Sequence, residues 1–222
     1  MKKLTVFALL AVTVLAVGAQ AAFVVEPHSS GKAFGNFAGT PRYSTGLSTA
    51  IGLTATSSAY GNTGAFPDVY VFSYTPGVDL DNTVLTAGTD LGNGDLASGL
   101  VGGGSGRYNV YITWCLSDNV TALADITVTN DGANVVSLGV DMDNVNAAQS
   151  DTVVSAGMNK WLRIAENVSL TAGVKYTVTQ SATADTWTSM RSSGVMWEMV
   201  PEPTTMLLLG IGGLVMRIRR SR

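Results

Sequence analysis

The globular part of this chain must end close to residue 200. Pro201 and Pro203 follow a β-prone stretch, and a proline supplies no backbone N–H to a sheet and fixes its own φ angle. Residues 204–216 then form an apolar run without a polar face, and four of the last six residues are arginines. We therefore expect this end to lie in a membrane, with its arginines on the side that carries the anionic headgroups.

This order of residues resembles the PEP-CTERM sorting signal, which is also described as an ice-binding-protein C-terminal domain. The residues that carry the resemblance are Pro201, Glu202, Pro203, Arg217, Arg219 and Arg220. The resemblance implies that an exosortase-type membrane transpeptidase recognises the tail, cuts it near the motif and delivers the body to the cell envelope or the extracellular matrix.

The apolar run is short for a membrane span. A helix needs about 20 apolar residues to cross the hydrocarbon core, and residues 204–216 supply fewer. We expect a short transmembrane helix that relies on local bilayer thinning or on arginines that reach the interface, and that serves as a transient inner-membrane anchor. The alternative is a buried or amphipathic terminal helix. Three glycines in the run and the lack of a polar stripe disfavour it.

The N-terminal end predicts export. Lys2 and Lys3 precede an apolar stretch at residues 4–17, and Ala19 and Ala21 fit the small-residue rule for a signal-peptide cleavage site. We expect passage through the Sec translocon, cleavage by signal peptidase and a mature chain that begins at Ala22. The alternative is an uncleaved N-terminal anchor.

The body between the two ends is acidic and has one cysteine. Seven basic side chains against fifteen acidic ones leave residues 22–199 with eight excess negative charges, so a nucleic-acid partner is not expected. Cys115 has no second cysteine to pair with inside the chain. Two interpretations remain, a small buried hydrophobic side chain and a thiol that pairs between chains.

Short β-prone runs separated by turn residues predict an all-β body. Tyr108, Val110, Ile112 and Trp114 alternate with polar or smaller residues and should share one face of a strand. Asp131-Gly132 predicts a hairpin turn. No stretch outside the two ends has a helical period, so we expect an antiparallel β-sandwich of the jelly-roll type. The main strands are expected at residues 69–74, 108–115, 125–129, 134–141, 160–165, 174–180 and 194–200.

These patterns divide the chain into four parts: a signal peptide at 1–21, an irregular region rich in Gly, Ser and Thr at 22–66, a β-sandwich domain at 67–199 and the sorting signal at 200–222. The body resembles golvesin-type and related carbohydrate-binding-module-like jelly rolls. The resemblance is carried by residues 106–114 and by the later strand segments at 161–164, 170–178 and 195–198. The resemblance covers about residues 70–199 and concerns packing positions, so it implies the fold. Cys115 departs from it, because those domains often carry proline there.

The sequence gives little support to catalysis. His28 is its only histidine, and it lies outside any expected strand that could orient it as a base. Asp79 with Asp81 and Asp141 with Asp143 form paired carboxylates in loop-like settings, where capping of turns is the simpler interpretation. We therefore expect a protein that is not an enzyme.

A structural Ca²⁺ is one alternative use of these carboxylates, since the ion takes oxygen ligands from loops. The candidate donors are Asp79, Asp81, Asp90, Asp95, Asp141 and Asp143. No other cofactor is expected.

Binding of sugar would need an exposed aromatic face. Trp187 and Tyr111 are the candidates, whereas Trp114, Trp161 and Trp197 lie in apolar patterns typical of a core. The sequence thus favours an exported structural or adhesive protein of the envelope or matrix. The alternative is a carbohydrate-binding module that contacts the cell's own extracellular polysaccharide.

Overall fold

The structure is a computed structural model that describes residues 21–61, 69–117, 124–131, 135–140, 142, 159–182 and 189–201. This part of the chain is nearly all β, with one short 3₁₀ helix, η1 (Phe34–Asn36). The expected signal helix and C-terminal transmembrane helix lie outside it. In the described ranges, no helix has the length and apolar character needed to cross a membrane.

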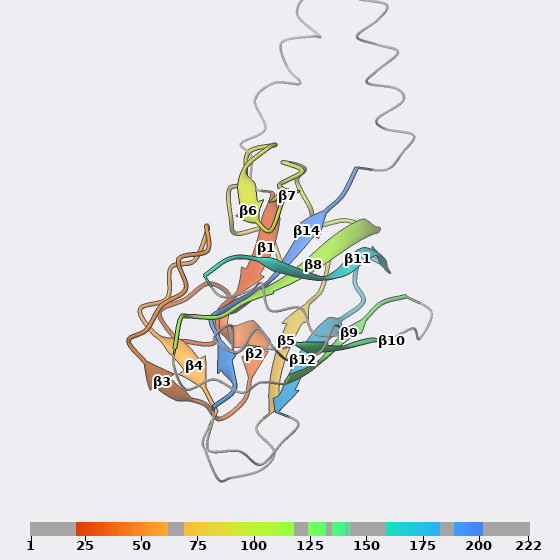
Figure 1. Cartoon of the computed structure of the whole chain (residues 1–222). Coiled ribbons are helices and arrows are strands. Elements are labelled where there is room, and N and C mark those ends of the chain that lie inside the picture. The colour runs from red at the N-terminus through yellow and green to blue at the C-terminus, as the bar shows by residue number, and fades with distance from the viewer. Residues whose placement is uncertain are drawn as a thin grey trace, which may run out of the picture.

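Two antiparallel sheets form a sandwich (Figure 1). The first, here called the inner-strand sheet, has the order β1-β14-β8-β11, and the second has the order β10-β9-β12-β5-β2. The strands of the first are β1 (Ala22–Val25), β14 (Gly194–Met199), β8 (Gly106–Thr113) and β11 (Leu162–Leu170). Those of the second are β10 (Val135–Val140), β9 (Ala124–Thr129), β12 (Tyr176–Ala182), β5 (Val69–Tyr74) and β2 (Phe37–Ala38).

Two small sheets complete the fold. One has the order β13-β4-β3, from β13 (Arg191–Ser192), β4 (Ser58–Tyr60) and β3 (Arg42–Ser44). The other is a hairpin of β6 (Asp90–Gly92) and β7 (Asp95–Leu96), in a stretch where no main strand was expected. The predicted all-β antiparallel sandwich is confirmed.

The main core lies between the two large sheets. Tyr108, Val110, Ile112 and Trp114 all point into it, as the period-two pattern predicted, and each is at most 1% exposed. Trp197 enters the same core from β14. The second sheet contributes apolar side chains from β5, β9 and β12 to the same core: Tyr70, Phe72, Tyr74, Ile126, Val128, Tyr176 and Val178.

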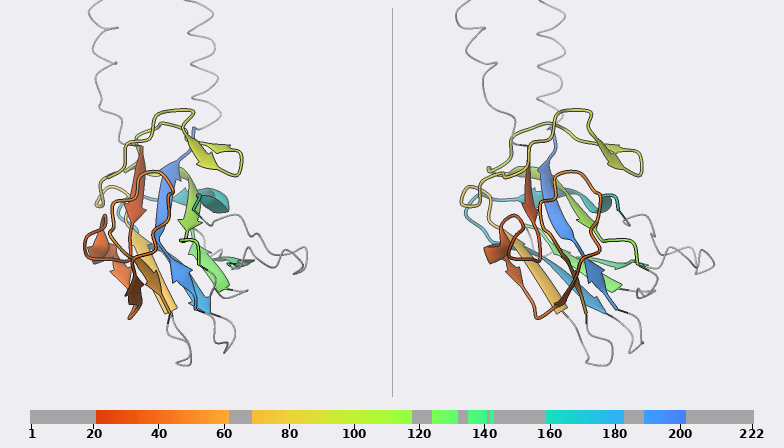
Figure 2. Two further views of the ribbon diagram at one scale, coloured as in Figure 1. Left: turned by 60° about the vertical axis from the view of Figure 1, so that its left-hand side comes forward. Right: turned by 90° about the vertical axis from the view of Figure 1, so that its left-hand side faces the viewer.

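The outer face of the inner-strand sheet is also buried. Val24, Tyr111 and Met196 on this face pack with Trp161 in a second apolar cluster, which the loops of residues 47–55 and 85–97 cover through Ala50, Leu53, Leu85, Leu91 and Ala97. The loop between β3 and β4 passes over β14 in both views of Figure 2. The inner-strand sheet is therefore covered on both faces.

Residues 22–61, expected as an irregular region outside the sandwich domain, contain four short strands, and two of them, β1 and β2, belong to the large sheets. β1 is the edge strand of the inner-strand sheet and pairs with β14 from Ala22↔Glu198 to Val25↔Val195. Its four residues are all buried, because its two faces point into the two apolar clusters. The N-terminal segment thus belongs to the sandwich.

Most expected strands lie within a few residues of their predicted positions. β9 and β10 pair from Ala124↔Val140 to Thr129↔Val135, as the hairpin prediction required. β11 runs to Leu170, beyond its predicted end, and its register with β8 shifts twice. Asn167, within the second shift, has a left-handed φ of 55°.

Candidate functional site

The sorting segment begins where a central strand of the sandwich ends. β14 lies between β1 and β8, and its last residue, Met199, pairs with Tyr108. The Val200 N–H donates to the Arg107 carbonyl (2.9 Å), and the Ser98 hydroxyl donates to the Met199 carbonyl (2.6 Å). The backbone is thus held up to the residue before Pro201. Glu202, Pro203, Arg217, Arg219 and Arg220 lie beyond the described residues.

The chain enters the sandwich at the same end. The N–H groups of Ala21 and Ala22 both donate to the Thr83 carbonyl (3.0 and 3.2 Å), and both residues are buried. Ala22 also faces Glu198 on β14. Of the two residues that define the predicted signal-peptidase site, Ala21 is buried in the fold and Ala19 lies outside the described chain.

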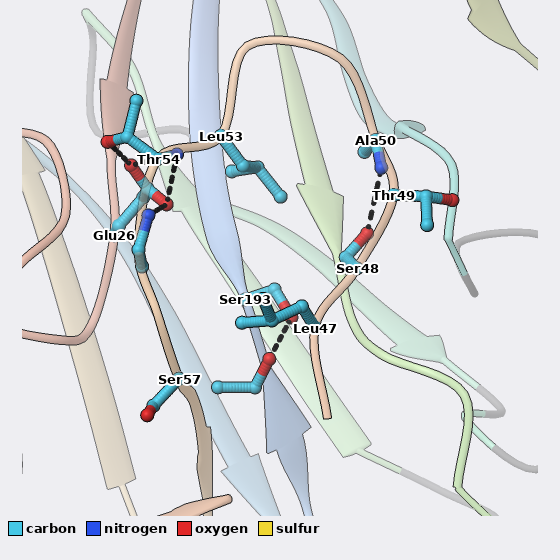
Figure 3. Close-up of a pocket in the computed structure, with 11 residues that line it drawn as sticks. Glu26, Leu47, Ser48, Thr49, Ala50, Leu53, Thr54, Ser57 and Ser193 are labelled. Carbon is cyan, nitrogen blue, oxygen red and sulfur yellow. Dashed lines mark hydrogen bonds between the residues drawn. The ribbon is translucent and has the colours of Figure 1, made fainter. Parts of the chain in front are cut away.

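A shallow pocket of about 260 Å³ opens beside the first strand (Figure 3). Hydroxyl groups supply much of its lining, and no aromatic ring contributes to it. The hydroxyl residues are Ser48, Thr49, Thr54, Ser57, Ser58 and Ser193. The hydroxyls of Ser58 and Ser193 form a hydrogen bond of 2.7 Å, and the hydroxyls of Ser48 and Thr113 form another of the same length. Several of these hydroxyls are therefore already engaged with protein partners.

Glu26 forms one wall of this pocket and is fully buried. Its carboxylate accepts hydrogen bonds from the backbone N–H groups of Lys32, Thr54 and Ala55 and from the Thr54 hydroxyl, at 2.7 to 3.1 Å. These bonds fix the loop after residue 50 to the end of β1 (Figure 3). Because its oxygens are occupied, Glu26 serves to hold the loop and is not placed to act as an acid or base.

A second polar cluster lies under the β6–β7 hairpin, on the outer face of the inner-strand sheet. Glu198 accepts a hydrogen bond from the Ser98 N–H (2.6 Å), and its other oxygen lies 3.4 Å from the Tyr111 hydroxyl. Asn109 donates to that same hydroxyl at 3.3 Å. Burial raises the pKa of the Glu198 carboxyl, and burial together with the Glu198 charge raises the pKa of Tyr111.

We expect this cluster to make the stability of the protein depend on pH. A carboxyl whose pKa is raised in the folded state contributes stability below its unfolded value, about 4.3 for glutamate, and loses it as the pH rises through the folded value. We expect the free energy of unfolding to fall less between pH 4.5 and 7 in Glu198→Gln than in the unaltered protein. Urea titrations across this range measure it. The matched control is Glu166→Gln, a carboxylate 59% exposed, which should leave the slope unchanged; equal slopes in all three proteins would contradict the assignment.

The glycan-contact prediction for Tyr111 was wrong. Its ring is 1% exposed, because loop residues that the sequence pattern did not connect with this face cover the sheet. Trp187, the other candidate, lies outside the described residues. Trp114, Trp161 and Trp197 are at most 1% exposed, which confirms their assignment to the core. Cys115 is also buried, as the simpler of its two interpretations predicted.

The structure does not bring the described calcium candidates together. Asp79 accepts from Asn36 and from the Thr75 N–H, whereas Asp81 accepts from the Gly102 N–H. Asp95 pairs with Arg163 (3.3 Å), and Asp90 accepts from the Gly92 N–H. Within the described ranges, no three acidic, histidine or cysteine side chains form a metal-binding group. Asp141 and Asp143 lie outside those ranges.

His28 belongs to a surface turn. Its Nδ1 lies 2.7 Å from the Ser30 hydroxyl and 3.2 Å from the Ser30 backbone nitrogen, and its ring meets Tyr43 edge-on. The Ser30 hydroxyl also contacts Thr56 at 3.0 Å. These contacts fold the turn onto the neighbouring loop.

Glu26 and Glu198, two buried carboxylates, were not among the site residues predicted from the sequence. Glu198 could have been found, since it follows the alternation of β14 on the same face as Met196. Glu26 carries no such signal, because its partners are mostly backbone N–H groups of residues far along the chain.

Comparison with known proteins concerns the tail and the fold separately. Residues 200–222 match the PEP-CTERM protein-sorting motif. This motif implies an exported, envelope-associated protein that an exosortase-type transpeptidase recognises. No curated protein matches the chain.

Two solved structures are similar to the body. A xanthan lyase from Paenibacillus shares 16% identity over 83% of this chain and 14% of its own, with a TM-score of 0.50. An exo-β-1,3-galactanase from Phanerochaete chrysosporium shares 12% identity over 80% of this chain and 29% of its own, with a TM-score of 0.34. The chain spans less than a third of either enzyme, and the first likeness supports the jelly-roll-like β fold alone.

Proposed function

We propose that this protein is an exported structural or adhesive component of the cell envelope or extracellular matrix, sorted and cut through its C-terminal segment by an exosortase-type transpeptidase. The match of residues 200–222 to the sorting motif carries the proposal. The fold supports it, because the motif directly follows a strand that is bonded into the centre of a sheet. Cleavage beyond Pro201 would therefore leave the sandwich intact.

The proposed role is not enzymatic. Glu26 is saturated with protein hydrogen bonds, and Glu198 is buried beneath the β6–β7 hairpin. His28 is held in a surface turn with Ser30. For the carbohydrate-binding alternative, Tyr111 is no longer a candidate contact residue because it is buried. The residues that line the pocket beside β1 include no aromatic ring. We therefore favour a role that depends on the delivered sandwich itself.

Replacing the C-terminal arginines is expected to block sorting. With Arg217, Arg219 and Arg220 changed to glutamine, the tail loses the charges that hold its end at the anionic face of the membrane, at about 1 kcal/mol for each residue. The uncut chain should then accumulate in cells, and little should reach the envelope fraction. Immunoblotting of separated membrane, envelope and medium fractions measures this.

The matched control removes the same charge from the body. Arg42, Lys160 and Lys175 are exposed, so their change to glutamine should leave sorting unaffected. Normal cutting and delivery of the arginine-substituted tail would overturn the proposed role of this segment.

A further inference from the structure

The segment between β5 and β8 exposes several apolar side chains at one end of the sandwich. We call them the apolar rim: Val78, Leu80, Val84, Leu96 and Val101. Leu80 is the most exposed, at 76%. All five belong to one segment of the chain, and large apolar side chains this exposed are suited to contact with an apolar partner.

The rim is held in place by hydrogen bonds. Within the segment, the Gly88 N–H donates to Ala97 and the Ala97 N–H donates to Thr89, each at 2.8 Å. Gly99 has a φ of 69°, and a Cβ there would lie 2.4 Å from the Ala87 nitrogen, so the two arms of the segment are in close contact. The Ser98 N–H bonds Glu198 on β14. The part of the segment that carries Leu96 is therefore fixed to β14.

The rim lies at the end of the sandwich where the chain enters and leaves. Thr83, next to Val84, accepts the N–H groups of Ala21 and Ala22, and Ser98 bonds the carbonyl of Met199. Figures 1 and 2 show the loops between β5 and β8 extending past the ends of β1 and β14. Both connections to the rest of the chain thus start beside the rim.

The tether from this end to the apolar tail is short. Three Cα-to-Cα steps lead from Pro201 to Thr204, and at about 3.3–3.6 Å each they span at most about 11 Å. The headgroup region on one side of a bilayer is itself about 5–8 Å thick. If residues 204–216 enter the hydrocarbon core, the tether cannot lift the rim clear of the membrane surface.

We propose that the apolar rim rests on the boundary between headgroups and acyl chains of the membrane that holds the tail. The proposal rests on the membrane anchoring in the proposed function. Residues 76–102 contain four aspartates and no lysine or arginine, so anionic lipids do not attract this segment. Contact depends on the tether and on apolar burial, and cutting near Pro203 would free the body from the membrane.

Nitroxide labels on the full-length chain test this contact. Single cysteines replace Leu80, Leu96, Leu209 or Leu116 in a Cys115→Ala background, and each labelled protein is reconstituted in phosphatidylethanolamine–phosphatidylglycerol vesicles. Leu116 is the matched control, because it is a leucine 61% exposed that follows β8 at the opposite end of the sandwich. Collision of the label with oxygen, relative to a water-soluble nickel complex, measures its contact with lipid.

We expect the ratio of oxygen to nickel collisions to rise severalfold at positions 80 and 96 on reconstitution, and to stay at its aqueous value at position 116. A lipid value at position 209 with aqueous values at 80 and 96 would overturn the seating of the rim and leave the proposed function intact. An aqueous value at position 209 would contradict the anchoring itself and the seating with it.

Discussion

Replacing Trp197 with alanine is expected to lower the free energy of unfolding by about 3–5 kcal/mol. The side chain is 1% exposed, and its ring packs against Phe23 (6.3 Å between centroids) and Tyr74 (5.6 Å) in the core between the sheets. Alanine would leave a cavity where β1, β14 and β5 meet. Urea unfolding followed by circular dichroism measures the change.

Two phenylalanine variants sharpen this test. The Trp197 indole N–H has no hydrogen-bond partner among the described residues, whereas the Trp114 indole donates to the Met142 carbonyl at 3.1 Å. Both changes remove similar ring volume from a buried site. Trp114→Phe should therefore cost about 1 kcal/mol more than Trp197→Phe, because it alone breaks a buried hydrogen bond. A larger cost for Trp197→Phe would contradict this account of the core.

A precursor that has already folded is expected to resist signal peptidase. Ala21 is fully buried and bonded through its N–H to Thr83, and Ala22 is paired with Glu198 in the inner-strand sheet. A protease must bind these residues as an extended, accessible strand, so β1 must first leave β14. We expect cleavage of the folded precursor to be about 100-fold slower than that of the unfolded chain, since the rate follows the population of the open form.

Purified signal peptidase in detergent micelles provides the measurement, with the precursor added either folded or freshly diluted from urea. Val25→Pro is the companion variant. The Val24 N–H faces away from β14 and donates to the Asn82 side chain (2.9 Å), so by alternation the N–H of Val25, which pairs with Val195, faces β14. Its removal should restore rapid cleavage of the folded protein. Equal rates for folded and unfolded precursor would show that β1 is not held as described. The order of the two events, cleavage of the signal peptide and pairing of β1 with β14, would then not matter.

The sequence predicted the longer strands that have a marked residue pattern, but it did not place β1 in the sheet. β8 alternates between large apolar and smaller residues, and β5 and β12 are rich in β-branched and aromatic residues, so their positions and core faces could be inferred. β1 is four residues long and buried on both sides, so it offers no alternation. Its place in the sheet depends on Glu198, Trp197 and Met196, which lie some 170 positions away in the chain.

The covered outer face explains the error at Tyr111. Its cover comes from Leu85, Leu91 and Ala97, single apolar residues spaced by glycine, threonine and aspartate in a stretch typical of loops. Nothing in such a stretch shows that it folds back over β8 and β14. The same limit applies to Glu26, whose four donors become neighbours only when the loop after residue 50 packs on β1.

The tail could be predicted more fully than β1 or Glu26, because its signal is a local order of residues that can be recognised without knowledge of the fold. Pro201, the apolar run and the arginine cluster identified it from the sequence, and residues 200–222 match the sorting motif. What the structure adds is its setting. The matched segment begins at Val200, directly after a strand that is paired on both sides, next to the place where the chain enters the fold.

Mass spectrometry of the mature C-terminus, on protein isolated from the envelope or matrix fraction of the native cell, tests the central claim most directly. We predict a chain that retains the strand through Met199, ends near Pro201 or Pro203 and lacks the apolar run and Arg222. Protein recovered from that fraction with Arg222 intact would contradict sorting by cleavage.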